Sequence, residues 1–213
     1  MKKVLLSGFE PFGGESINPS LKLIKRLENE RWDDVEVHLV QLPVVFGESI
    51  KKLKKVIDEV DPDLVIGIGQ AGGRTALSIE RVAINVDDAV IADNEGNQPI
   101  DRPINSKGPA AYFSTLPIKR MMKAAREAGV PAMISNSAGT YVCNHLMYGI
   151  LDLLAGTDKL GGFIHIPYLP EQVVDRPLQP SMALETMVKG IKAMVMAAVS
   201  GDKDDKIAAG ALD

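Results

Sequence analysis

Short apolar runs alternate with longer stretches of helical periodicity along this chain, and this alternation limits its possible folds more than any other feature. Short apolar runs are typical of buried strands, whereas apolar residues three or four apart indicate helices. Strands are predicted at 4–7, 35–42, 64–68, 77–86, 132–135 and 163–166. Helices are predicted after 18–19, over 46–60, from 115 to 129, at the cysteine segment and over 181–199. The pattern predicts an α/β fold with a mixed, mostly parallel, twisted sheet covered by helices on both faces.

Composition restricts the class of protein. With 213 residues and no visible linker, residues 1–213 are predicted to form a single domain, of which about 201–213 fray. The net charge of −4 and the lack of a clustered basic face argue against nucleic acid binding. No stretch approaches the roughly 20 apolar residues of a membrane span. A single cysteine and no targeting signal predict a cytoplasmic protein.

The distinctive residues gather where predicted strands end. Glycine-rich segments follow the strands at 4–7 and 64–68, the cysteine segment follows the strand at 132–135, and His165 lies near the end of its own strand. In open α/β sheets, ligands bind at the carboxyl ends of the strands. The sequence therefore predicts a site at that edge of the sheet.

Cys143 is the only cysteine and lies in the run SAGTYVCNH at 137–145, where a turn leads into a predicted helix. The first amides of a helix lack internal partners and carry a partial positive charge, which favours a thiolate. A thiolate is a nucleophile, so Cys143 is a candidate catalytic residue. The alternative is a buried, structural cysteine, which is the commoner role of a lone cysteine.

A nucleophilic thiol needs a base and a group that orients the base. His165, on an apolar strand, is the candidate base; His145 lies two residues from Cys143, a spacing that does not face it on a helix, and His38 lies in an early strand. Glu80 is the candidate orienting group, because alternation over 77–86 places this carboxylate on the face of Val82 and Ile84, where it needs a partner. That partner is either His165, or Arg74 or Arg81 in a structural ion pair.

Cofactor and metal sites are not indicated. The glycine-rich segment 8–14 lacks the lysine-serine ending of a phosphate loop and the dinucleotide glycine spacing. Its Phe9 and Phe12 point instead to an apolar pocket wall. Cys143, His165 and Glu80 have no companions at the spacing of zinc ligands, so no metal is expected.

Taken together, these segments resemble type I pyroglutamyl peptidases, also called pyrrolidone-carboxylate peptidases. The resemblance covers nearly the whole chain. Its motifs are LSGFEPFGG at 6–14, GQAGGR at 69–74, ERVAIN at 80–85, DNEG at 93–96, SAGTYVCN at 137–144 and GFIHIPY at 162–168. The resemblance implies an α/β/α sandwich and a cytosolic cysteine peptidase that removes N-terminal pyroglutamate from peptides. It also implies a homotetramer without a cofactor or metal.

Matched by motif, Cys143 corresponds to the family's nucleophile, His165 to its general base and acid, and Glu80 to the residue that orients the imidazole. The positions that match the family's substrate pocket are Phe9, Phe12, Tyr141 and Val142 as walls, with Asn18 and Gln70 as polar positions. Aromatic walls suit the small, flat, uncharged pyroglutamyl ring, and a few polar groups satisfy its lactam. Such a site should reject proline, which lacks the lactam carbonyl.

One departure from the family pattern affects the expected pH dependence. Val90 stands where family members commonly carry Arg near the cysteine, and Ala92 replaces a usual Pro. We therefore predict an active enzyme whose pH–rate profile has its acid limb displaced upward. Two other functions stay open: a phosphorylase-like transferase that binds phosphate through Arg74, and a pyroglutamyl-binding homologue without turnover.

Overall fold

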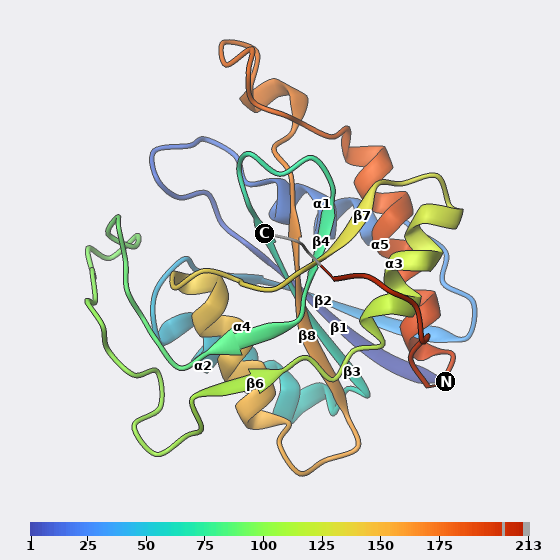
Figure 1. Ribbon diagram of the computed structural model, residues 1–213, viewed down its shortest axis with the longest axis horizontal. Helices are drawn as coiled ribbons and strands as arrows, with labels where there is room; N and C mark the ends of the chain where they lie inside the picture. The colour runs from blue at the N-terminus through green and yellow to red at the C-terminus, as the bar shows by residue number, and fades with distance from the viewer. Residues whose placement is uncertain (202, 211–213) are drawn as a thin grey trace.

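The structure is a computed structural model that describes residues 1–201 and 203–210, in which strands and helices alternate as expected for an α/β fold (Figure 1). The strands are β1 (Lys2–Phe9), β2 (Val35–Leu42), β3 (Leu64–Gln70), β4 (Leu77–Glu80), β5 (Val82–Ile84), β6 (Ala111–Phe113), β7 (Ala132–Ser135) and β8 (Leu160–Ile166). The helices are α1 (Pro19–Leu27), α2 (Glu48–Val60), α3 (Ile118–Glu127), α4 (Val142–Leu153) and α5 (Leu184–Val199), with a 3-10 turn at Pro170–Gln172.

The main sheet has the order β2-β1-β3-β8-β4-β7. Strands β2, β1, β3 and β8 run parallel, whereas β4 runs antiparallel to β8 and parallel to β7. The sheet is therefore mixed and mostly parallel, as predicted.

Helices cover both faces of this sheet. On one face, α1, α3 and α5 pack over alternate strand residues such as Ile164 and Ile166. On the other, α2 and α4 pack over the intervening residues, among them Leu5 and Phe163. The small β5–β6 sheet lies on this second side, against α4. The predicted three-layer α/β/α sandwich is confirmed, and we call the layer of α2 and α4 the site face because His165 alternates onto it.

The predicted single strand over 77–86 is wrong. The chain leaves the main sheet at Arg81, whose amide bonds to Ser135, and continues as β5, which pairs with β6 in a separate sheet. As a result, Glu80 shares its face of β4 with Ser78 rather than with Val82 and Ile84. The apolar pattern continues across Arg81 and does not mark this break.

The predicted meeting of strand ends holds for β1, β3 and β8 but not for β7. Because β7 runs opposite to β8, its carboxyl end pairs with Glu80 and does not lie at the edge where β1, β3 and β8 end. The connection 136–141 then crosses the site face to bring the chain to α4. Cys143 therefore reaches the site through this connection and not through the end of its preceding strand.

The long connection between β5 and β6 has little regular structure, but hydrogen bonds hold it. Asp87 and Arg102 form an isolated bridge. The buried carboxylate of Asp93 accepts hydrogen bonds from the amides of Phe46, Glu95 and Asn97. These bonds outweigh burial, which raises the pKa of Asp93, and leave that pKa below its usual value. The connection is thereby fixed against the segment that precedes α2.

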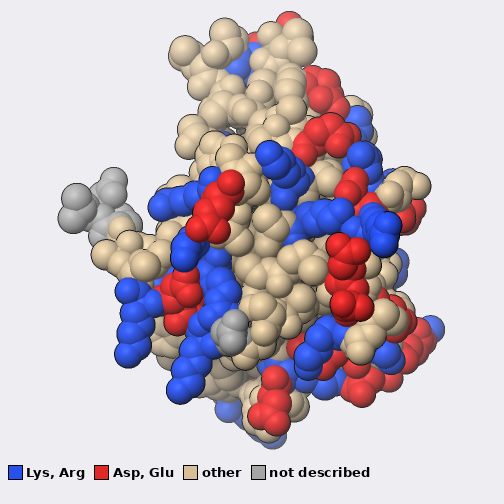
Figure 2. All heavy atoms as spheres, turned by 90° about the vertical axis from the view of Figure 1, so that its right-hand side faces the viewer, with Lys and Arg blue, Asp and Glu red and all other residues tan. Residues whose placement is uncertain are grey.

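In the layer of α1, α3 and α5, ion pairs connect α1 and the residues after it to α5. Arg26 of α1 contacts Glu185 of α5, and Lys192 of α5 contacts Glu30 beyond α1. Figure 2 shows positive and negative side chains interspersed over this side of the molecule. Over the described residues, no helix combines the length and apolar character that crossing a membrane requires.

The described residues beyond α5, 200–201 and 203–210, form no helix or strand, and Asp204 accepts hydrogen bonds from the first amides of α3, those of Lys119 and Arg120. The prediction that 201–213 fray concerns in part residues 202 and 211–213, which lie outside the described residues.

Candidate active site

Cys143 occupies the first turn of α4, as predicted. The first hydrogen bond of the helix runs from the His145 amide to the Tyr141 carbonyl, so the amides of Val142, Cys143 and Asn144 have no partner within the helix. No side chain caps them from Tyr141. This end of α4 therefore presents amide donors beside the thiol.

The thiol lies directly over β3, where a glycine makes room for it. A methyl group built on Gly69 would come within 2.8 Å of Cys143 Sγ and within 2.8 Å of the Phe163 ring. Gly69 is the register partner of His165 on the neighbouring strand β8. Because paired residues of parallel strands point to the same face, the thiol and the imidazole stand side by side.

His165 connects to a buried carboxylate. Its Nδ1 lies 2.7 Å from Oε1 of Glu80, which is fully buried. The same oxygen lies 3.1 Å from a guanidinium nitrogen of Arg74, which also donates to the Ser137 carbonyl. Of the three partners left open by the sequence, His165 and Arg74 thus both bind Glu80, whereas Arg81 bonds to Asn136 instead. In the described part of the chain, Nε2 of His165 has no hydrogen-bond partner, so it remains available on the site face.

The pKa of the thiol is higher than its position at the start of a helix predicts. Burial, and after it the charge of Glu80, raise the pKa of Cys143 to about 12, although the charge of Arg74 acts to lower it. The raised pKa is opposite to the depression that the helix start predicts, because burial penalises the charged thiolate. The thiol keeps its proton until a neighbouring base accepts it.

A narrow cavity of about 10 Å³ opens next to the sulfur. All six predicted pocket residues line it, together with Cys143 and Val44: Phe9, Phe12, Asn18, Gln70, Tyr141 and Val142. The rings of Phe12 and Tyr141 face each other with centroids 6.0 Å apart, and the Tyr141 hydroxyl donates to the Ala92 carbonyl. The cavity walls are therefore largely aromatic and apolar, and ring movement must widen it for any ligand larger than water.

The two polar positions of the cavity differ in how they are engaged. Asn18 caps α1, accepting from the Ser20 amide and donating to the Glu10 carbonyl, so its amide is mostly committed to the chain. Gln70 accepts a hydrogen bond from Gln172 through its oxygen, which leaves its amide nitrogen as a donor toward the cavity. Only Gln70 thus offers a clear hydrogen-bond donor to a ligand carbonyl.

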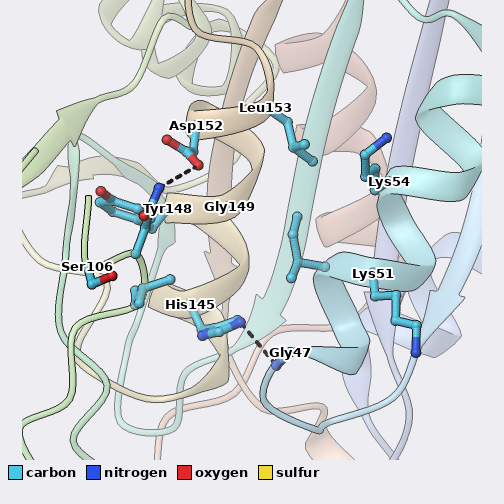
Figure 3. Close-up of a pocket in the computed structure, with 12 residues that line it drawn as sticks. Gly47, Lys51, Lys54, Ser106, His145, Tyr148, Gly149, Asp152 and Leu153 are labelled. Atoms are coloured by element: carbon cyan, nitrogen blue, oxygen red, sulfur yellow. Dashed lines mark hydrogen bonds between the residues drawn. The ribbon is translucent and has the colours of Figure 1, made fainter. Parts of the chain in front are cut away.

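A larger cavity of about 570 Å³ lies on the other side of α4, between α2 and α4 (Figure 3). His145 lines it, accepting from the Gly47 amide through Nε2 and bonding Asp87 through Nδ1. Cys143 does not line it. The prediction that His145 is not the base for the thiol agrees with this geometry, since both ring nitrogens are engaged.

Comparison with known proteins identifies the family. A model of the family described as pyroglutamyl peptidase matches residues 2–201. This chain belongs to the pyroglutamyl peptidase family. A relative from Escherichia fergusonii, named pyrrolidone-carboxylate peptidase, is 54% identical over 212 residues, which are 99% of each chain. A Yersinia pestis relative of the same name is 52% identical over the full length of both chains.

Solved structures of the family have the same fold. Pyroglutamyl peptidase I from Bacillus amyloliquefaciens is 44% identical, with a TM-score of 0.93 over 96% of this chain and 100% of that one. A mutant pyrrolidone carboxyl peptidase from Pyrococcus furiosus is 47% identical, with a TM-score of 0.90 over 93% and 99% of the two chains. Membership of this cysteine peptidase family leaves the phosphorylase-like interpretation without support.

Two residues at this site are not indicated by the sequence for the parts they take there. Val44 lines the narrow cavity, and Gly69 admits the thiol. The GQAGGR motif contains Gly69, but its glycines suggest a tight turn and not the space for a sulfur from another element. The exposed side chain of Val90 is directed to solvent, 93% accessible.

Proposed function

We propose that this protein is a cysteine peptidase that removes N-terminal pyroglutamate from peptides. Membership of the pyroglutamyl peptidase family supports this proposal, and so does a thiol that lies beside an imidazole bonded to a buried carboxylate. The observation that carries it is the thiol of Cys143 lying over Gly69, the register partner of His165. Such an arrangement suits acyl transfer through a thioester.

In this mechanism, Nε2 of His165 accepts the proton of Cys143 as the sulfur attacks the pyroglutamyl carbonyl. Amides at the start of α4, including that of Cys143, stabilise the oxyanion. His165 then protonates the departing amine and activates a water molecule that hydrolyses the thioester. Glu80 holds the tautomer with a proton on Nδ1 and stabilises the imidazolium, as the carboxylate of a catalytic triad does.

The narrow cavity is the proposed binding site for the pyroglutamyl ring. Phe9, Phe12, Tyr141 and Val142 enclose the flat ring, and the free amide of Gln70 donates to the lactam carbonyl. Asn18 supports this wall by fixing the start of α1. Proline leaves the Gln70 donor unpaired, and free glutamate brings charges that this apolar site does not balance.

We further propose a homotetramer in the cytoplasm, on family resemblance. Exposed apolar side chains such as Leu178 and Val174 provide surface for such an assembly. A lone catalytic thiol is also best preserved in a reducing compartment. Light scattering during size-exclusion chromatography measures the mass directly, and a monomer at micromolar concentration contradicts the tetramer.

Hydrolysis of a pyroglutamyl amide with a chromogenic leaving group tests the activity. Wild type is compared with Cys143→Ser, and a proline amide serves as the specificity control. The proposal predicts turnover of the pyroglutamyl amide alone and its loss in Cys143→Ser. A folded wild type that binds this amide without hydrolysing it instead favours the pyroglutamyl-binding homologue.

A further inference from the structure

A second cleft lies on the site face of the sheet, beyond Arg74, and has a volume of about 500 Å³. Residues of the turn before β4 form one wall, and β7 with the start of the 136–141 connection forms the other. Strand β7 is the outermost strand at this end of the sheet (Figure 1). Arg74 belongs both to the wall of this cleft and to the contacts of Glu80.

The order of the strands sets the course of a bound peptide. The ring cavity lies at β1 and β3, the thiol lies over β3, and His165 stands on β8. Because His165 must protonate the departing amine, the peptide beyond the scissile bond has to leave on the β8 side of the thiol. The next strands in that direction are β4 and β7.

The side chains of β7 that line the cleft lie on the same face as His165. This holds for Met133 and Ser135, which alternate onto the site face because Ala132 and Ile134 belong to the core on the other face. Ile134 also borders the cleft. The Met133 side chain is 41% accessible and forms an apolar floor. Thr75 and Ser137 place hydroxyl groups around it.

The register of the sheet gives the length of peptide needed. Ser78 pairs with His165 on one side and with Met133 on the other, so Met133 lies two strands from the imidazole. Two spacings between strands amount to about 10 Å, which about three extended residues cover. A chain that leaves His165 therefore reaches Met133 with its second or third residue.

We propose that this cleft binds the residues that follow pyroglutamate in a peptide substrate, and that it prefers an apolar side chain at the second or third of them. The site is distinct from the ring cavity and rests on the proposed function. Arg74 stands at the boundary between the two, held by Glu80 and by the Ser137 carbonyl.

The test compares kcat/KM for a pyroglutamyl amide that has no further residue with kcat/KM for pyroglutamyl peptides of one, two and three added residues. With leucine as the last residue, the ratio of peptide to amide is expected to rise at the second or third addition. Met133→Trp fills the cleft and is expected to lower that ratio on the order of tenfold, the effect of losing an apolar contact. Thr75→Trp fills it from the opposite wall and is expected to act in the same direction.

Ile100→Trp is the matched control, because Ile100 is 72% accessible and lines neither cavity. It should retain the wild-type ratio. Turnover that stays intact with the same ratio in Met133→Trp and Thr75→Trp as in wild type overturns the cleft assignment and leaves the proposed function standing. Failure of wild type to hydrolyse any pyroglutamyl substrate overturns the proposed function and the assignment with it.

Discussion

Two buried histidines in this protein each pair with a carboxylate, yet their surroundings differ. His145 bonds Asp87 at 2.9 Å through Nδ1 and also accepts from the Gly47 amide, so both nitrogens serve the fold. His165 bonds Glu80 at 2.7 Å through Nδ1, while Nε2 faces the site on the strand next to Gly69. A histidine–carboxylate pair therefore indicates chemistry only when the second nitrogen remains available beside a reacting group.

This difference predicts that a substitution of His165 lowers turnover, whereas the matched substitution of His145 lowers stability. The larger effect is expected for His165→Gln. Glutamine keeps a polar group near Glu80 but cannot exchange protons, so kcat/KM for a pyroglutamyl amide should fall by about 10²- to 10⁴-fold. Steady-state kinetics with a circular dichroism check on folding measures this effect. A folded His165→Gln variant with wild-type turnover contradicts the role of His165.

The thiol beside His165 should react slowly with alkylating agents in the free protein. With its pKa raised to about 12, Cys143 is protonated at neutral pH. Below that pKa, the thiolate fraction increases about tenfold for each unit by which the pH increases. The rate of iodoacetamide alkylation should therefore climb from pH 7 to pH 10 without a plateau. A plateau below pH 8 indicates a depressed thiol pKa and removes this part of the account.

Arg74 makes the His165 pair different again, because its guanidinium contacts the carboxylate of Glu80 as well. Removing the guanidinium in Arg74→Met removes the charge that lowers the Cys143 pKa. The loss of this partly exposed charge should raise the thiol pKa by on the order of one unit or less. The rate of alkylation at pH 9 should therefore fall several-fold. Arg74→Lys is the control, since it retains the charge and should recover part of the rate; equal rates in all three proteins refute the electrostatic effect.

His145→Gln is the structural counterpart. It disturbs two buried hydrogen bonds, so the free energy of unfolding in urea should fall by about 1–3 kcal/mol. The kcat/KM of the folded protein should stay within a few-fold of wild type. A loss of turnover as large as that of His165→Gln, at unchanged stability, makes the comparison between the two histidines invalid.

Val90→Arg has the smallest expected effect. The exposed position accepts a long side chain, and a positive charge there should move the acid limb of the pH–rate profile downward. The measurement is kcat/KM between pH 5 and pH 9. An unmoved limb shows that the departure at Val90 does not influence the thiol.

The sequence predicted the architecture because strand and helix periodicity survive in the apolar pattern. It also indicated Glu80 and His165 as a possible pair, because a buried carboxylate requires a partner, although the apolar face assumed for Glu80, with Val82 and Ile84, is wrong. It did not predict the break at Arg81 or the direction of β7, because strand order and direction depend on contacts between distant segments. It did not predict the raised thiol pKa either, since that depends on how completely the sulfur is buried.

The central claim is that Cys143 carries the acyl group during turnover. Rapid quenching of the reaction with a pyroglutamyl amide, followed by mass spectrometry of proteolytic fragments, tests this most directly. The account predicts a pyroglutamyl thioester on the fragment that contains Cys143, absent from Cys143→Ser. The claim is contradicted if Cys143→Ser hydrolyses the amide as fast as wild type and no labelled fragment forms in either protein.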